Sequence, residues 1–326
     1  MKKELEIWQF VAERLKQNKS VMLLVVAESL GSSPGRKGFK MAVAEDDLRG
    51  SIGGGAMEVR LVGQARCKIP DLEFKVDSEI IKQVHQKNSP NKSGMICSGK
   101  QTVIFFKLNK SHLKTVREII RALKHYQPKN LQISNLKFQI SENYSDEFDF
   151  CFEQKDKNNF LFQEKLGFKN KLFIIGGGHC ALALSELMSK MDFHITLFDD
   201  RPNLNTIAKN KFVHEKRIIE GYENISDFIY SGANHFVVVM TLGYKSDEIV
   251  IRKLLDKNFK YFGVLGSRAK MATLLKNLRK ENYSAEKLSK IHTPIGLPIN
   301  SQTPEEIAVS IAAEIIAVKN VNFVDL

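Results

Sequence analysis

Hydrophobic and polar residues follow one another along the first part of the chain in patterns that predict short helices and strands. Residues 4–17 carry apolar side chains at helical spacing, and residues 20–27 form an apolar run typical of a strand buried on both faces. The glycine-rich stretch 31–38 predicts a turn, and a strand is expected at residues 39–44. Three glycines at 53–55 then precede a helical pattern, so a triple-glycine loop should open a helix, as it does in many anion sites.

The remainder of this half has the pattern of a mixed α+β domain. Residues 94–106 predict a cysteine-containing turn that enters an apolar strand, and residues 111–125 predict a helix. Residues 128–168 alternate apolar and polar positions, which indicates two or three antiparallel strands. We therefore expect a first domain over residues 1–168, with the linker near residues 167–170.

The second half has a different rhythm, in which short apolar strands alternate with helical patterns. The segments that carry it are 171–179, 180–191, 194–200, 235–241 and 261–267. Strands that are apolar on both faces and separated by helices are typical of a parallel sheet. The sequence therefore predicts an α/β, Rossmann-like domain over residues 169–326, and a length of 326 residues fits two domains.

Composition indicates a folded protein with an unusually basic charge. Hydrophobic residues make up 43% and charged residues 26% of the chain, which disfavours disordered, collagen-like and disulfide-rich classes. The formal net charge of +12 suggests nucleic acid, an anionic lipid or a phosphorylated small molecule as a partner. Lysines greatly outnumber arginines, whereas base reading favours arginine. We therefore expect mostly surface lysines and no nucleic-acid partner.

The four cysteines show neither zinc-ligand spacing nor a disulfide framework, so no metal site is predicted. Cys67 and Cys151 are expected in the core. The first residues lack the apolar segment of a signal peptide, and no run is long enough to cross a bilayer. A cytoplasmic protein without membrane contact is the expectation.

A strand that ends in Gly176-Gly177-Gly178 and opens a helix gives the strongest local signal. The pattern is G-x-G-x-x-A, in which small residues let a pyrophosphate approach the helix N-terminus. Such folds also need an acidic residue at the tip of the second strand to hold a ribose, and Asp199 stands 23 residues after Gly176. Arg201 follows closely, so a 2′-phosphate stays open. The alternative is a Rossmann scaffold that binds no dinucleotide.

These and further blocks resemble the XdhC/CoxI family, the accessory proteins of xanthine dehydrogenase and related molybdenum hydroxylases. The resemblance extends over nearly the whole chain. It rests on these blocks: Gly31-Ser32-Ser33-Pro34, Lys40-Met41, Gly50 to Gly55 with Glu58, the Cys97 turn, Gly176 to His179, Asp199 to Pro202, Thr241, Gly263, Gly266-Ser267-Arg268, His292 to Leu297, and Thr303 to Ala308.

The resemblance implies a maturation factor and not the dehydrogenase itself. Similar proteins bind the molybdenum cofactor in its molybdopterin form, protect it while a cysteine desulfurase adds the sulfido ligand, and deliver it to the apo-enzyme. The partners implied are therefore a xanthine dehydrogenase-like apo-enzyme and a cysteine desulfurase. A nucleotide form of the cofactor occurs in some bacteria, and the sequence leaves that choice open.

Candidate cofactor contacts in the first domain are hydroxyls, cations and glycine N–H groups. Ser32, Ser33, Arg36, Lys37 and Lys40 are candidates to bind a phosphate, together with the backbone of Gly53, Gly54 and Gly55. An exposed hairpin turn would explain the same residues. Cys97 offers a soft sulfur ligand, although it stands in Cys-Ser-Gly where the family has Cys-Gly-Gly. A buried structural thiol is the alternative for Cys97.

In the second domain the candidates follow the carboxyl ends of the strands. Besides Gly176, Gly178 and Asp199, they are His179, Thr241, Ser267, Arg268 and Lys270. His179 is a candidate acid or base, as Cys97 is a candidate nucleophile, although capping of a helix explains His179 equally well. The family often has Thr-His where this chain has Thr241-Leu242.

Two alternatives accompany the maturation hypothesis. The glycine motif with Asp199 would also suit an NAD(P)-dependent oxidoreductase of unknown substrate, and NAD(P) is therefore a second candidate cofactor. The apolar helix near the C-terminus is expected to pack on the sheet or on a second copy of the chain, which would make a homodimer.

Overall fold

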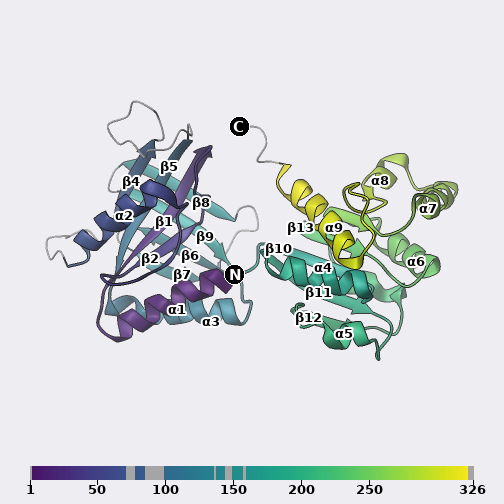
Figure 1. Ribbon diagram of the computed structural model, residues 1–326, viewed down its shortest axis with the longest axis horizontal. Helices are drawn as coiled ribbons and strands as arrows, with labels where there is room; N and C mark the ends of the chain where they lie inside the picture. Colours follow the sequence, from purple (N-terminus) through teal and green to yellow (C-terminus); the bar gives the residue numbers. More distant parts are fainter. Residues whose placement is uncertain are drawn as a thin grey trace. The chain divides into compact units, whose positions relative to one another are not determined.

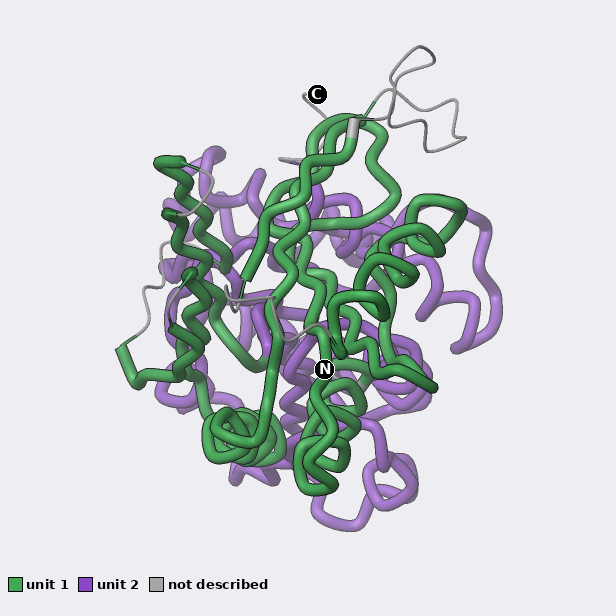
Figure 2. Tube along the Cα trace, turned by 90° about the vertical axis from the view of Figure 1, so that its left-hand side faces the viewer, with its two compact units in different colours: residues 1–167, 326 green, residues 168–325 purple. Residues whose placement is uncertain are grey.

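The computed structural model describes residues 2–70, 78–84, 99–135, 137–143, 149–156 and 159–321. The chain divides into two compact units, residues 1–167 and 168–325 (Figures 1 and 2). Each unit has its own hydrophobic core. Within the described ranges, no helix combines the length and the apolar character that crossing a membrane requires.

Unit 1 is built on a five-stranded antiparallel sheet that is buried on both faces. Its order is β3 (Leu48–Gly50), β2 (Lys40–Val43), β1 (Val21–Gly31), β5 (Gly99–Leu108), β4 (Ser78–Val84). Helix α2 (Gly55–Lys68) covers one face through Met57 and Leu61. Helix α1 (Lys2–Lys16) packs on the other face. Cover on both faces explains why β1 is one continuous apolar run.

A second antiparallel sheet closes the core of unit 1 beneath α1. Its order is β7 (Phe138–Ser141), β6 (Lys129–Ser134), β9 (Asn159–Leu166), β8 (Phe150–Asp156), and it follows η1 (Lys110–His112) and α3 (Leu113–Lys124). Phe138 brings the aromatic side chains together, since its ring centroid lies 5.9 Å from that of Trp8 and 5.5 Å from that of Phe106. Residues far apart in the sequence thus share one core.

Unit 2 is a six-stranded parallel sheet with helices on both faces (Figure 1). The order is β12 (Glu215–Ile218), β11 (Phe193–Asp199), β10 (Asn170–Ile175), β13 (Gly232–Val239), β14 (Phe259–Val264), β15 (Ile291–His292). Numbered within the unit, this is third, second, first, fourth, fifth, sixth, the strand order of a Rossmann-type fold. The order reverses between β10 and β13, where ligands bind in open α/β sheets.

Two apolar clusters hold the helices of unit 2 on its sheet. One cluster joins the sheet to α4 (His179–Ser189), α5 (Asn205–Lys209) and α9 (Pro304–Lys319). The other joins it to η2 (Tyr222–Asp227), α6 (Tyr244–Leu254), α7 (Arg268–Lys280) and α8 (Ala285–Ser289). Helix α9 begins with Pro304 behind the capping residue Thr303, as expected for a helix start, and it packs on α4.

The predicted fold class, a Rossmann-like parallel sheet after a mixed α+β domain, is confirmed. Two details differ from the sequence prediction. Four strands, β6 to β9, occur where two or three were expected. Cys67 is exposed and not part of the core, because α2 turns Met57, Leu61 and Ala65 toward the sheet and Cys67 lies off that face.

Two stacked histidines at the start of β11 and β12 make the stability of unit 2 depend on pH. The rings of His194 and His214 lie 4.9 Å apart, and the Ile195 N–H donates to His214 Nδ1 at 3.0 Å. Burial and the neighbouring His194 lower the pKa of His214 to about 4, although Glu215 opposes the shift. The neutral imidazole is therefore the form that the folded protein holds.

We expect unit 2 to lose stability as the pH falls from about 6.5, the ordinary histidine pKa, to about 4. Over this range the unfolded chain binds a proton at His214 that the folded chain does not. Since His214 is only half-buried, solvent screening reduces the loss to about 1–2 kcal/mol. Urea unfolding of His214→Phe between these pH values should show a smaller pH dependence than wild type. The exposed His179→Asn variant should behave as wild type, and an unchanged pH dependence in His214→Phe would refute the assignment.

Candidate functional site

The glycine turn of unit 2 is fixed between the two strands that flank β10. Gly176 has φ +105°, and a Cβ there would lie 2.2 Å from the Met240 carbonyl oxygen, which is backbone and cannot move aside. The Gly176 N–H donates to the Phe198 carbonyl at 2.8 Å. Only glycine fits this position, as the motif predicted.

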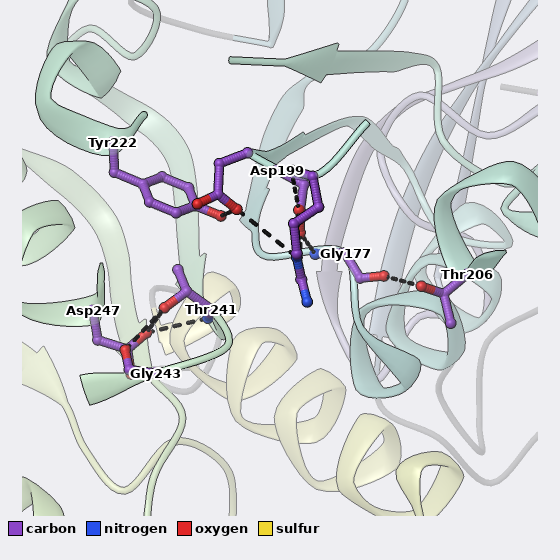
Figure 3. Close-up of polar contacts among 9 residues, drawn as sticks. Gly177, Asp199, Thr206, Tyr222, Thr241, Gly243 and Asp247 are labelled. Atoms are coloured by element: carbon purple, nitrogen blue, oxygen red, sulfur yellow. Dashed lines mark hydrogen bonds and ion pairs between the residues drawn. The ribbon is translucent and has the colours of Figure 1, made fainter. Parts of the chain in front are cut away.

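Asp199 lies at the end of β11, fully buried beneath the turn (Figure 3). Its Oδ2 accepts the Gly177 N–H at 2.6 Å, and its Oδ1 accepts the Arg201 N–H at 2.8 Å. The Arg201 guanidinium adds two hydrogen bonds, one to each carboxylate oxygen, both of 2.8 Å. Burial alone would raise the pKa of Asp199, but the bonds from Arg201 and Gly177 outweigh it and lower that pKa. Asp199 is thus an ionised clamp on the turn.

This clamp uses the groups that a dinucleotide would need. The Asp199 carboxylate, predicted to hold a ribose, already accepts four hydrogen bonds. The Gly177 N–H is donated to Asp199, and the Gly177 carbonyl accepts a hydrogen bond from Thr206 of α5 (Figure 3). Gly178 remains half-exposed as the N-cap of α4, and His179 is exposed beside it.

A second clamp lies after β13, where Thr241 was predicted as a site residue. The Thr241 hydroxyl donates to Asp247 Oδ1 at 2.6 Å, and the Thr241 N–H donates to the same oxygen at 3.1 Å (Figure 3). Lys270 of α7 reaches Asp247 Oδ2 at 2.9 Å. Asp247 is buried in the first turn of α6, and the sequence analysis did not select it. Thr241 and Lys270 therefore join three strand–helix connections.

The other candidates at this edge differ in exposure. Ser267 is the N-cap of α7 and accepts the Lys270 N–H at 3.3 Å. Ser267 and Arg268 are exposed, and so is Leu242, which retains 81% of its accessible surface. Among the described residues, His179, Ser267 and Arg268 are thus the predicted polar groups of unit 2 whose side chains face solvent.

In unit 1 a buried glutamine links two of the predicted loops. The Gln101 Oε1 accepts the Ser33 hydroxyl at 2.8 Å and the Gly35 N–H at 3.3 Å, and its Nε2 donates to the Ile52 carbonyl at 2.9 Å. Gln101 lies on β5 and is 1% exposed. The sequence analysis missed it, although a glutamine inside an apolar strand was the available signal.

The same loops touch each other through glycines. A Cβ at Gly35 would lie 2.1 Å from the Ile52 carbonyl oxygen, and one at Gly53, which has φ +129°, would lie 2.5 Å from the Gly35 nitrogen. A Cβ at Gly99 would lie 2.6 Å from the Ser33 nitrogen. We call residues 33–35, 52–54 and 99–101 the glycine platform. Its three segments pack backbone against backbone.

Glu58 satisfies the triple-glycine loop from within the protein. Its Oε2 accepts the Ser51 hydroxyl at 2.7 Å and the N–H groups of Ile52 and Gly54 at 2.8 and 2.9 Å. The Gly53 N–H donates to the Ser51 hydroxyl oxygen at 3.1 Å. Of the three glycines predicted to bind phosphate, Gly55 is the one whose N–H neither Glu58 nor Ser51 accepts, and Gly55 is exposed.

Lys40 has a structural environment and not an open one. Its ammonium is buried and lies 2.6 Å from a Glu164 oxygen and 3.0 Å from Glu4. Burial alone would lower the pKa of Lys40, but the two carboxylates outweigh it and raise that pKa. Ser33 is likewise buried, whereas Ser32 and Arg36 are exposed. Cys97 lies outside the described residues.

The architecture thus defines a protein with a Rossmann-type unit and an α+β unit that carries a glycine-lined loop cluster. Within the described ranges, no group of three or more His, Cys, Asp or Glu side chains is arranged to hold a metal ion. Comparison with known proteins places this architecture in a family.

The model of the XdhC Rossmann domain matches residues 172–315, and the model of the XdhC and CoxI family matches residues 14–72. Together the two ranges cover more than half of the chain. The chain belongs to the XdhC/CoxI family, and the resemblance noted from its motifs is confirmed.

Relatives by sequence and by structure agree with this membership. The chain is 29% identical over 158 residues to the uncharacterized protein YqeB of Escherichia coli, a match that spans 47% of this chain and 28% of YqeB. It is 29% identical over 163 residues to a probable xanthine dehydrogenase component of Bacillus subtilis, spanning 49% of this chain and 46% of that protein. These matches thus span less than half the length of either curated relative.

A crystal structure described as a xanthine dehydrogenase from Bacillus halodurans has the same fold. It aligns with a TM-score of 0.71 and 21% identity, covering 98% of this chain and 96% of that one. The two-unit fold therefore extends over the full length of a solved relative.

Proposed function

We propose that this protein is a xanthine dehydrogenase accessory protein that binds the molybdenum cofactor, supports its sulfuration and delivers it to a xanthine dehydrogenase-like apo-enzyme. Family membership supports an accessory role. The observation that carries the proposal is the glycine platform, because it gathers sequence blocks typical of the family into one place.

The residues around the platform suit a phosphorylated pterin. Positions without side chains let a flat ligand approach the backbone, and the exposed Ser32 and Arg36 offer a hydroxyl and a guanidinium to its phosphate. When bound, the cofactor supplies a dithiolene-held molybdenum centre for later use by the dehydrogenase. The protein's own residues bind and orient it, while Lys40, Ser33 and Glu58 hold the loops from within.

The Rossmann-type unit gives less support to the NAD(P)-dependent oxidoreductase considered above. A ribose would have to compete with Arg201 for Asp199, and a pyrophosphate would find the Gly177 N–H already donated. We therefore assign unit 2 a scaffold role, with its exposed His179, Ser267 and Arg268 as candidate contacts. Fluorescence titration with NADH and NADPH should show no saturable binding, and tight binding with turnover would favour the oxidoreductase.

Cofactor binding is tested by mixing the purified protein anaerobically with the molybdopterin form of the cofactor. After gel filtration, the wild-type protein should carry molybdenum and pterin near one equivalent each. Cys97→Ala should lose the cofactor about tenfold faster, which corresponds to about 1.4 kcal/mol. Cys67→Ala removes an exposed thiol on α2 and serves as the matched control, with wild-type retention expected. Absence of saturable binding to the wild-type protein would refute the proposal.

A further inference from the structure

Gln101 uses both ends of its side-chain amide to join loops that are distant in the sequence. Ser33 and Gly35 stand 68 and 66 positions away, and Ile52 stands 49 positions away. Its amide oxygen accepts two hydrogen bonds from the first loop, and its amide nitrogen donates to the second. A side-chain amide accepts and donates at the same time without carrying a charge, which suits a buried position.

The backbone contacts around Gln101 make the separation of the two loops sensitive to this one side chain. Gly35 and Gly53 already touch, with the Gly53 Cβ position 2.5 Å from the Gly35 nitrogen. Gly99 stands two positions before Gln101 on the same strand and packs against the Ser33 backbone. Ser32 and Arg36, the exposed polar groups proposed to meet the cofactor phosphate, flank the loop segment that Gln101 holds.

We propose that Gln101 is the positioning residue of the cofactor site, which rests on the proposed function. It fixes the loop that carries Ser32 and Arg36 against the triple-glycine loop before any ligand arrives, so that binding does not have to order them. It touches the loops and not the cofactor. Loss of Gln101 should therefore weaken cofactor retention beyond what any loss of stability explains.

Two variants separate the halves of the amide. Gln101→Leu removes the acceptor and the donor, whereas Gln101→Glu keeps an acceptor for Ser33 and Gly35 and sets a carboxylate against the Ile52 carbonyl. Amide hydrogen exchange should speed up in both loops of Gln101→Leu, and chiefly at residues 52–54 in Gln101→Glu. Cofactor retention should shorten about tenfold in both, equivalent to about 1.4 kcal/mol.

The matched control is Gln83→Leu. Gln83 is 4% exposed, pairs with Gln101 across β4 and β5, and accepts its hydrogen bond from Arg60 of α2, outside the platform. This variant should lower the melting temperature as Gln101→Leu does and leave loop exchange and cofactor retention as in wild type.

Equal loss of retention in the Gln83 and Gln101 variants would overturn the proposal in favour of a general stability effect. Unchanged exchange at both loops in Gln101→Leu would overturn it as well. Failure of the proposed function looks different. In that case the wild-type protein binds no cofactor, and the exchange data alone decide whether Gln101 joins the loops.

Discussion

Replacing Lys40 with methionine should destabilise unit 1 by about 3–5 kcal/mol, because it leaves the buried Glu164 carboxylate without its cation. Glu164 retains only 3% of its side-chain exposure, so water cannot replace the lost partner. The loss appears in urea unfolding followed by tryptophan fluorescence. Trp8 is the only tryptophan of the chain and is fully buried in the core of unit 1, so its signal reports on this unit.

A second substitution identifies the source of this loss. Adding Glu164→Gln to Lys40→Met removes the stranded charge and should restore much of the stability. Lys37→Met, at a partly exposed neighbouring lysine, should change it by about 0.5 kcal/mol or less. If Lys40→Met unfolds within about 1 kcal/mol of wild type, Lys40 is not the buried cation described above.

Replacing Gly176 with alanine should destabilise unit 2 by about 3 kcal/mol or more. The new Cβ would meet the Met240 carbonyl oxygen at 2.2 Å, and φ +105° is a conformation that side-chain-bearing residues rarely adopt. The strand end of β10 and the start of α4 would have to move away from β13. Urea unfolding followed by circular dichroism, together with hydrogen exchange of the β10 amides, measures the effect.

The neighbouring glycine provides the control. Gly178 has φ −69°, and a Cβ there meets no atom within 4 Å. Gly178→Ala should therefore cost about 1 kcal/mol or less, mainly through poorer capping of α4. Similar losses for the two alanine variants would contradict the assignment of Gly176 to a tight contact between neighbouring strands.

The fold of unit 2 was predictable because its central strands are buried on both faces. The segments that became β10, β11, β13 and β14 are apolar without interruption, and helices separate them as a parallel sheet requires. Strand β12 escaped prediction because it lies at the sheet edge and all four of its residues are exposed. Neither alternation nor an apolar run marks such a strand.

The sequence predicted where site residues lie better than it predicted their partners. The spacing from Gly176 located Asp199 at a strand end, but the two-pronged bond from Arg201 depends on how the chain turns after β11. Lys40 was predicted to bind phosphate. Its carboxylate partners, Glu4 and Glu164, stand 36 and 124 positions away and meet it only when the two sheets and α1 pack together.

Gln101 illustrates the same limit in unit 1. A glutamine within an apolar strand is a visible signal, yet nothing in the local pattern shows that two glycine loops will meet its amide. The role of a buried polar side chain follows from its hydrogen-bond partners, and these come from distant segments.

Transfer of the cofactor tests the central claim most directly. Protein loaded anaerobically with sulfurated molybdopterin-form cofactor is mixed with a xanthine dehydrogenase-like apo-enzyme, and molybdenum content and xanthine oxidation by the dehydrogenase are followed after the proteins are separated. The account predicts that molybdenum leaves this protein, appears in the dehydrogenase and restores its activity faster than free cofactor does. Activation no faster than with free cofactor, with molybdenum still on this protein or never bound to it, would contradict the account.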